Sequence, residues 1–379
     1  MKKIFITGGH FSPAAAVISL LEKSGQWQIY YVGRRTAMED DPSEALEYRE
    51  LFPDKNLHYL VITTGRLQRR FFVNVGQSLK SLSKMVSGLL QAFYWLGRYR
   101  PNVVLSFGGY VALPVVVAAY FFGVPVITHE QTLAPGLANK IIFRLSRKVL
   151  ISWPVSGKHF PESKVVLTGN PLREKVKELA QNYRPPDGSD GRTPQIYITG
   201  GNQGAHVINL AVEEILGKLL EKYRIVHQTG DSCLFKDFDR LVKLREKLPA
   251  PLAARYELHK FLNETEVAGI LAGADLVISR SGANTVTELA AVGLPAVFIP
   301  LPFATGGEQL ANARLLKDRG AAEILDQEHL TGRSLLSLID RMIGKIGKYR
   351  EAARASRSLI SLEAGENIVQ QIENLTIRS

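Results

Sequence analysis

The chain has 379 residues, of which 45% are apolar and 22% are charged, and its formal net charge is +11. This length is too great for one ordinary core and favours two domains, and the composition excludes a fibrous or a disordered chain. The single cysteine, Cys233, excludes a disulfide framework and fits a reducing compartment.

The first predicted element is a buried strand that runs into a glycine turn. Residues 2–10 read KKIFITGGH, and a helix is predicted over about 13–23. The charged start resembles that of a signal peptide, but the apolar run reaches Gly8 and Gly9 too early for an h-region. We therefore expect a strand here and a cytoplasmic protein.

The same pattern returns in the second half of the chain. Residues 195–202 read QIYITGGN and lead into a helix predicted over about 205–220. This repetition indicates two Rossmann-like, doubly wound parallel-sheet domains, whose ligands bind at the carboxyl ends of the strands, so that one cleft would face both glycine turns. Neither turn completes G-x-G-x-x-G and there is no Walker loop, so the dinucleotide and P-loop fingerprints are absent.

Basic charge is concentrated in the first half, where Glu130 is the only carboxylate between Arg66 and Lys158. Nucleic acid, membrane and phosphorylated ligands are all anionic partners for such a region. An amphipathic helix is predicted to begin near Phe72, and its C-terminal half is expected to face the core. Its N-terminal end is predicted to dock on an anionic membrane through Arg66, Arg69, Arg70, Phe71 and Phe72.

Two polar segments follow the next strands. The strand over 103–107 leads to Gly108, Gly109 and Tyr110. The apolar run over 111–127 is interrupted by proline and glycine, which favours a short helix and a strand over a membrane span. The motif HEQT over 129–132 comes next, and a lone His-Glu pair is more often structural than catalytic.

The second half contains a strand, 276–278, that ends in SRSG and restarts as a helix with Asn284 and Thr285 in its first turn. Such a helix start exposes backbone N–H groups and attracts anions, phosphate above all. Glu288 lies one turn further in, where a carboxylate can accept two hydrogen bonds from vicinal ribose hydroxyls. Gln309 follows a second strand and a proline-rich loop.

The whole segment 279–313, SRSGANTVTELAAVGLPAVFIPLPFATGGEQLANA, resembles the donor-binding segment of the MurG family, the peripheral-membrane N-acetylglucosaminyltransferases that make lipid II. The resemblance covers nearly the whole chain: GGYVALP at 108–114, HEQT, GNPLR at 169–173 and ITGGNQGAHVIN at 198–209 all have family counterparts. The chain departs from the family pattern in its shorter first glycine loop, in Thr132 where the family has Asn, and in Asn202 where it has Ser.

The resemblance implies a GT-B architecture of two doubly wound α/β domains facing a central cleft. Residues 1–170 would form the acceptor- and membrane-binding domain, with the C-terminal helix, 357–379, packing back on it, and 171–356 would bind the UDP-sugar. The implied reaction transfers N-acetylglucosamine from UDP-GlcNAc to lipid I with inversion at the anomeric carbon. The implied setting is peripheral, on the anionic inner leaflet at the cytoplasmic face of the bacterial cell membrane, with no nucleic-acid partner.

Roles for single residues follow from the same resemblance. His10 is the expected general base, although a histidine in this turn could instead cap the next helix. No cofactor or metal is expected, because helix N-termini and Arg173 would stabilise the leaving diphosphate. Acceptor contacts are expected from Gly108, Gly109, Tyr110, Glu130 and Thr132. Donor contacts are expected from Thr7, Gly8, Gly9, Arg173, Asn202, Gln203, Gly204, Leu262, Ser281, Gly282, Ala283, Asn284, Thr285, Val286, Thr287, Glu288 and Gln309.

Two other functions remain open from the sequence. A GT-B enzyme of other specificity, such as a glycolipid synthase or a UDP-sugar 2-epimerase, would share the donor half. A non-catalytic membrane scaffold that binds a UDP-sugar would show donor binding without turnover.

Overall fold

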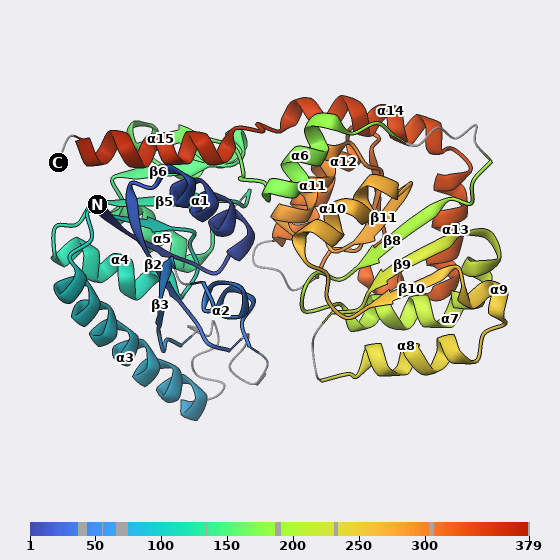
Figure 1. Cartoon of the computed structure of the whole chain (residues 1–379), viewed down its shortest axis with the longest axis horizontal. Coiled ribbons are helices and arrows are strands. Elements are labelled where there is room, and N and C mark those ends of the chain that lie inside the picture. Colours follow the sequence, from blue (N-terminus) through green and yellow to red (C-terminus); the bar gives the residue numbers. More distant parts are fainter. Residues whose placement is uncertain are drawn as a thin grey trace. The chain divides into compact units, whose positions relative to one another are not determined.

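The computed structural model describes residues 1–36, 44–54, 56–65, 75–133, 135–185, 191–230, 234–302 and 307–377, with the backbone alone at 75–80. The chain divides into two compact units (Figure 1). The first unit comprises Met1–Leu172 and Ser361–Ser379, and the second comprises Arg173–Ile360.

The first unit is built on a seven-stranded sheet in the order β3-β2-β1-β4-β5-β6-β7, with every pairing parallel. The order reverses between β1 and β4, which makes this the topological switch point. The strands are β1 Lys2–Thr7, β2 Trp27–Gly33, β3 Leu57–Val61, β4 Val103–Ser106, β5 Val126–Glu130, β6 Lys148–Ile151 and β7 Val165–Leu167.

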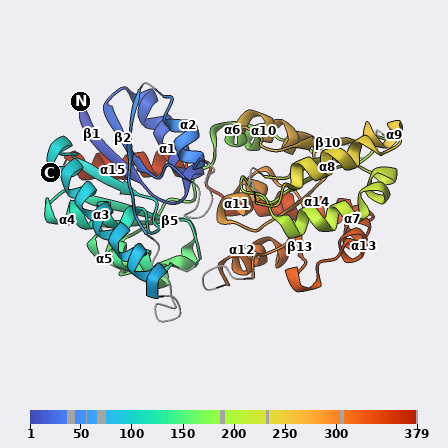
Figure 2. The same ribbon diagram turned by 90° about the horizontal axis from the view of Figure 1, so that it is seen from below.

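Helices cover both faces of this sheet (Figure 2). Successive side chains of a strand point to opposite faces, so Ile4 and Ile6 pack with α1 and α15, whereas Phe5 packs with α3 and α4. The helices are α1 Phe11–Ser24, α2 Leu46–Leu51, α3 Val75–Tyr99, α4 Ala112–Phe121, α5 Leu137–Leu145 and α15 Ala364–Ile377, with short 3-10 turns at Pro154–His159 and Glu162–Lys164.

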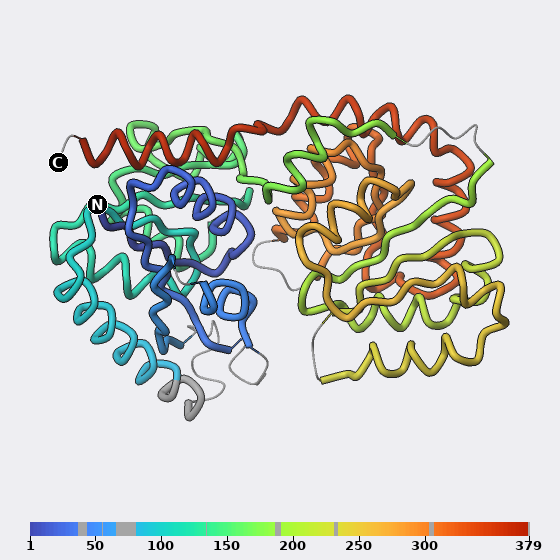
Figure 3. Tube along the Cα trace, in the orientation of Figure 1, coloured from blue at the N-terminus to red at the C-terminus, as the bar shows by residue number. Residues whose placement is uncertain are grey.

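The last helix belongs to the first unit although it ends the chain (Figure 3). Ile368 and Ile372 of α15 are fully buried in the same core cluster as Ile18 and Leu21 of α1. Burial of such side chains contributes about 1.5–3 kcal/mol each. The first sheet is therefore closed on one face by the two ends of the chain.

The second unit repeats the architecture with a six-stranded parallel sheet in the order β10-β9-β8-β11-β12-β13. Its switch point lies between β8 and β11. The strands are β8 Gln195–Thr199, β9 Arg224–Gln228, β10 Tyr256–His259, β11 Leu276–Ser279, β12 Ala296–Phe298 and β13 Ala322–Ile324. The prediction of two doubly wound parallel-sheet domains is confirmed.

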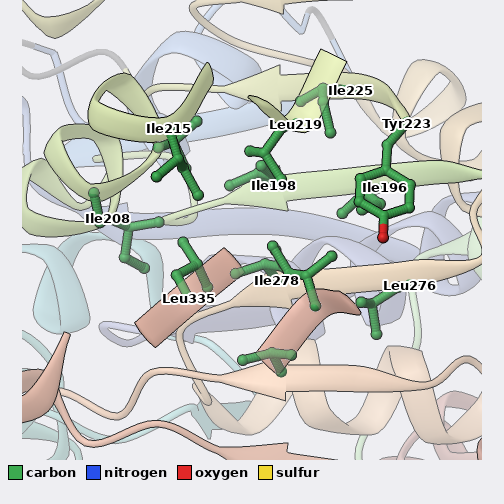
Figure 4. Packing of buried hydrophobic residues seen from close by; sticks show 14 of the residues in the cluster. Ile196, Ile198, Ile208, Ile215, Leu219, Tyr223, Ile225, Leu276, Ile278 and Leu335 are labelled. Carbon is green, nitrogen blue, oxygen red and sulfur yellow. The ribbon is translucent and has the colours of Figure 1, made fainter. Parts of the chain in front are cut away.

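The core of the second unit lies between this sheet and α7 and α13 (Figure 4). Ile198 of β8 and Ile278 of β11 face Ile215 of α7 and Leu335 of α13. The helices are α6 Glu174–Asn182, α7 His206–Lys222, α8 Asp237–Glu246, α9 Ala250–Ala253, α10 Glu264–Gly273, α11 Ala283–Val292, α12 Glu308–Lys317, α13 Gly332–Ile343 and α14 Ile346–Ser356, with 3-10 turns at Gln327–His329 and Arg357–Leu359.

Helix α3 differs from the sequence prediction. The C-terminal part of its apolar stripe, Leu82, Val86, Leu89 and Phe93, was expected to face the core. Phe93 packs on the core and Leu89 is half-buried, but Leu82 and Val86 are exposed. The buried side of this part of the helix carries Ala92 and Leu96 instead. By contrast, the run over 111–127 forms α4 and the start of β5 as predicted, and no helix within the described residues is long and apolar enough to cross a membrane.

Candidate functional site

Two glycine turns meet at the switch point of the first sheet. Thr7, the last residue of β1, pairs with Ser106, the last residue of β4, so the segments that follow them lie side by side. The N–H of Gly9 donates to the carbonyl of Gly108 at 3.0 Å. Gly8 has a φ of 151°, and a Cβ there would lie 2.7 Å from Cβ of Phe107, so only glycine fits this close approach.

His10 stands directly after this turn, as the residue that precedes α1. Its side chain makes no capping hydrogen bond, so the structure does not use the ring to cap the helix. Burial lowers the pKa of His10 below its usual 6.5, which keeps the imidazole neutral at pH 7. A neutral ring that does not cap its helix can accept a proton.

The second turn is fixed by a short hydrogen-bonded chain. The side-chain oxygen of Asn139, on α5, accepts from the N–H of Gly109 at 2.8 Å, and its amide group donates to Glu130 Oε2 at 2.7 Å. Glu130 Oε1 accepts from the hydroxyl and the N–H of Thr132. Glu130 thus holds Asn139, and Asn139 holds the turn.

Glu130 and Thr132 were expected to contact an acceptor, but the structure gives them this internal role. Both are buried, and burial raises the pKa of Glu130 although its three hydrogen bonds act in the opposite direction. Asn139 was not singled out from the sequence, because nothing local links it to a glycine thirty residues earlier. Tyr110 is partly buried, and its hydroxyl accepts from Arg34 at 2.7 Å.

The histidine of HEQT is also structural. Gln131 donates to Nδ1 of His129 at 3.0 Å, which places the ring proton on Nε2, where it is donated to the carbonyl of Gly169 at 2.8 Å. Burial lowers the pKa of His129 to about 4, so the ring stays neutral. His129 therefore ties β5 to the segment that leads out of the first unit.

The second sheet repeats this geometry at its own switch point. Thr199 of β8 pairs with Ser279 of β11, and each strand is followed by a turn and a helix. The residues before α7 and α11 are Ala205 and Gly282, and no side-chain hydrogen bond caps either helix. Two helix starts with backbone N–H groups open to a ligand therefore lie at adjacent strand ends, an arrangement suited to phosphate.

The positions expected to bind the donor along α11 fall into two groups. Gly282, Asn284 and Thr285 are partly exposed at the helix start, with Ala283 beside them. Val286 and Thr287 are fully buried, and the hydroxyl of Thr287 donates to the carbonyl of Ala283 at 2.8 Å. Their side chains face the core, so only the backbone at these two positions could meet a ligand, and donor contact there stays a prediction.

The other expected donor residues surround that helix start. The hydroxyl of Ser281 is buried and donates to the carbonyl of Gln309 at 2.8 Å. Gln309 Oε1 accepts from the N–H of Leu301 at 2.9 Å, which turns the NH₂ group of the amide away from that loop. Asn202 is partly buried, Gln203 is exposed, and the side chain of Leu262 is buried, so Leu262 would offer a ligand its backbone.

Arg173 and Glu288 form a two-fold ion pair in the second unit. Nε and Nη2 of Arg173 donate to the two carboxylate oxygens of Glu288, each at 2.7 Å, in a fork with 21% and 11% of the side chains exposed. Burial alone would lower the pKa of Arg173, but the Glu288 carboxylate outweighs it and raises the pKa. Each oxygen keeps a second lone pair, so Glu288 can still accept hydroxyl hydrogen bonds.

Some sequence predictions fall outside what the structure describes. Arg66, Arg69, Arg70, Phe71 and Phe72 lie outside the described residues, so their membrane role stays a prediction. Within the described parts of the chain, no group of three or more His, Cys, Asp or Glu side chains could hold a metal ion.

Comparisons with known proteins agree with this geometry. The glycosyltransferase family 28 N-terminal domain matches residues 7–151, and the family 28 C-terminal domain matches 195–372. A Bacillus cereus protein named UDP-N-acetylglucosamine--N-acetylmuramyl-(pentapeptide) pyrophosphoryl-undecaprenol N-acetylglucosamine transferase 2 is 32% identical, with 98% of this chain and 99% of that protein aligned. A Clostridium kluyveri transferase of the same activity is 34% identical over 94% of this chain and 95% of its own length. The crystal structure of Acinetobacter baumannii MurG matches with a TM-score of 0.70 and 28% identity, covering 99% of this chain and all of that one.

Proposed function

The chain belongs to the MurG family of glycosyltransferases, and we propose from this that it transfers N-acetylglucosamine from UDP-GlcNAc to lipid I, the undecaprenyl-pyrophosphoryl-MurNAc-pentapeptide, to form lipid II. The observation that carries the proposal is the Arg173–Glu288 fork on α11, the helix whose uncapped start lies at the switch point of the second sheet. It combines acceptors for ribose hydroxyls with donors for a diphosphate.

In the proposed donor site, the N–H groups at the starts of α7 and α11 bind the diphosphate of UDP. Charge that develops on the leaving diphosphate is stabilised by these fixed dipoles, which need no rearrangement during the reaction. Glu288 accepts from the ribose hydroxyls while Arg173 holds its carboxylate in place, and the backbone of Leu262 meets the uracil.

In the proposed acceptor reaction, His10 takes the proton of the 4-hydroxyl of the muramoyl sugar as that oxygen attacks the anomeric carbon. The C–O bond to UDP breaks as the new glycosidic bond forms, so a single in-line displacement inverts the anomeric configuration. The Glu130–Asn139 chain keeps the Gly109 turn in place beside His10.

The test is a UDP-release assay on purified protein with UDP-GlcNAc and lipid I. We expect UDP to be released only when both substrates are present, together with formation of lipid II. Release of UDP without lipid I, or formation of another hexosamine from UDP-GlcNAc, would favour a hydrolase or a 2-epimerase. Donor binding with no turnover would favour the scaffold function.

Gln309 is expected to select the sugar of the donor. Its oxygen is used by Leu301, which leaves its NH₂ group to bond a sugar hydroxyl. A site built to bond a hydroxyl rejects analogues in which that group is inverted. Gln309→Ala should therefore reduce the preference for UDP-GlcNAc over UDP-N-acetylgalactosamine about tenfold or more in kcat/KM. An unchanged ratio, with kcat/KM lowered equally for both sugars, would remove this role.

We also propose that α3, α4 and α5 form the face that docks on the membrane. Leu82, Val86, Leu90 and Tyr94 recur at every fourth position along the exposed side of α3, and Leu90 and Tyr94 are 66% and 67% exposed. The end of α4 continues this surface, since the Phe121 ring lies 5.7 Å from that of Phe93 and is itself 70% exposed. On α5, exposed Leu137 and Ile141 alternate with exposed Lys140 and Arg144.

Such a mixture of apolar and basic side chains suits an anionic membrane surface. The double variant Leu90→Ser, Tyr94→Ser should bind phosphatidylglycerol vesicles more weakly, by about tenfold or more, in a sedimentation assay, because burying one such side chain contributes about 1.5–3 kcal/mol. The matched control is Leu210→Ser, Leu234→Ser, two exposed leucines of the second unit, which should bind normally. Equal binding by both double variants would exclude this face.

A further inference from the structure

A pocket of about 260 Å³ in the second unit lies outside every part of the site described above. Four arginines line it, Arg184, Arg350, Arg354 and Arg357, and the other lining residues include Val292 and Tyr183. Pockets that take small organic ligands combine an apolar wall with a few charged groups in this way.

The arginines reach the pocket from two separate segments. Arg350, Arg354 and Arg357 follow one another at steps of four and three, which places them on one face of α14 and the turn after it. That face packs towards α11, whose last residue is followed by Gly293 with a φ of 84°. A Cβ at Gly293 would lie 3.1 Å from Cδ of Arg357, so glycine leaves room for the arginine stems. Arg184 comes from the segment after α6.

The charge of this pocket is not balanced within the described residues. Asp275 pairs with Arg350 and also with Arg192, and Arg357 donates to the carbonyl of Ala180. Arg184 and Arg354 are exposed, and neither side chain makes a hydrogen bond or an ion pair within the described part of the chain. No carboxylate is among the lining residues, and Asp275 offsets the charge of Arg350 alone, so Arg184, Arg354 and Arg357 keep a positive charge at the pocket with no carboxylate paired to them within the described residues.

We propose that this pocket binds a phosphate-bearing organic anion as a second ligand, separate from the donor nucleotide. Guanidinium groups match phosphate oxygens with paired hydrogen bonds, and Tyr183 and Val292 would cover the apolar body of the ligand. The pocket adjoins the C-terminal end of α11, whereas the donor site uses its N-terminal start. Ten helical residues, about 15 Å, separate the two ends, so one small ligand does not occupy both.

The test is titration calorimetry with inorganic diphosphate in the presence of saturating UDP, which fills the donor site. The wild-type protein should still bind diphosphate, with an affinity that falls as salt is added. The double variant Arg184→Ser, Arg354→Ser should bind it at least tenfold more weakly. The matched control Arg245→Ser, Arg333→Ser removes two exposed arginines of the same unit and should stay within twofold of wild type. Unaltered thermal unfolding and UDP affinity would show that the double variant is folded.

Two results would overturn the proposal: no diphosphate binding once UDP is saturating, or equal binding by wild type and the Arg184→Ser, Arg354→Ser variant. A second arm separates a soluble ligand from a lipid headgroup by measuring binding to phosphatidylglycerol and phosphatidylcholine vesicles. We expect the variant to bind both vesicles as wild type does. Loss of phosphatidylglycerol binding with intact diphosphate binding would contradict a pocket for a soluble ligand.

Discussion

Replacing His10 with alanine is expected to lower kcat by about 100-fold or more, the usual scale for a general base, while the affinity for UDP stays close to that of wild type. The reason is that His10 stands at the switch point of the first sheet, whereas the groups proposed to bind UDP belong to the second unit. The measurements are kcat from UDP release and the Kd of UDP from calorimetry.

The pH dependence gives an independent check. Burial lowers the pKa of His10, so the neutral, proton-accepting form persists below pH 6.5 and is lost only as the pH falls through the lowered value. The acid limb of kcat/KM should therefore lie below pH 6.5 and disappear in His10→Ala. His159→Ala, which removes an exposed histidine of the same unit, is the control. It should change neither kcat nor the pH of the acid limb. A His10→Ala enzyme that lost UDP affinity as strongly as turnover would point to a structural role.

Replacing Glu288 with alanine is expected to weaken UDP binding and to lower the free energy of unfolding by about 3 kcal/mol, because it leaves the largely buried guanidinium of Arg173 unpaired. Chemical denaturation of the wild type and variant measures the second effect. The double variant Arg173→Ala, Glu288→Ala should lose less free energy of unfolding than the two single variants lose together, since the two residues act as one pair. Glu178→Ala removes an exposed ion pair with Lys175 and should have no comparable effect.

The role in ribose binding can be separated from the role in stability. If Glu288 accepts from both vicinal hydroxyls, wild-type protein should prefer UDP over 2′-deoxy-UDP, and Glu288→Ala should lose most of that preference. If Glu288→Ala is destabilised but still prefers UDP over 2′-deoxy-UDP as strongly as wild type does, Glu288 does not bind the ribose and serves only as the partner of Arg173.

Much of the fold could be predicted because its signals are local. Buried parallel strands are continuous apolar runs, and the two strand–glycine–glycine turns lie at the strand ends, where doubly wound sheets bind ligands. Asn284 and Thr285 were placed correctly at a helix start for the same reason. Within α11, however, the helical period alone turns Val286 and Thr287 into the core, which the sequence motif did not reveal.

The rest depends on contacts between distant segments. Arg173 and Glu288 are 115 positions apart, so the sequence does not show that they contact each other. Each was therefore predicted to bind the ligand alone. In α3, the apolar period was correct but only part of the apolar stripe faces the core: Phe93 packs on it, whereas Leu82 and Val86 are exposed. An amphipathic pattern predicts which side of a helix is apolar, but it does not show whether that side packs on the protein core or faces a membrane.

The helix α15 has a consequence for the order in which this protein can be completed during synthesis. Its buried isoleucines fill the core of the first sheet, yet they are the last part of that core to leave the ribosome. The second unit, by contrast, is continuous from Arg173 to Ile360 and can close before the chain ends. The unit that is translated first is therefore the one that is finished last, and a chain cut short after Ile360 would retain a complete second unit beside an open first one.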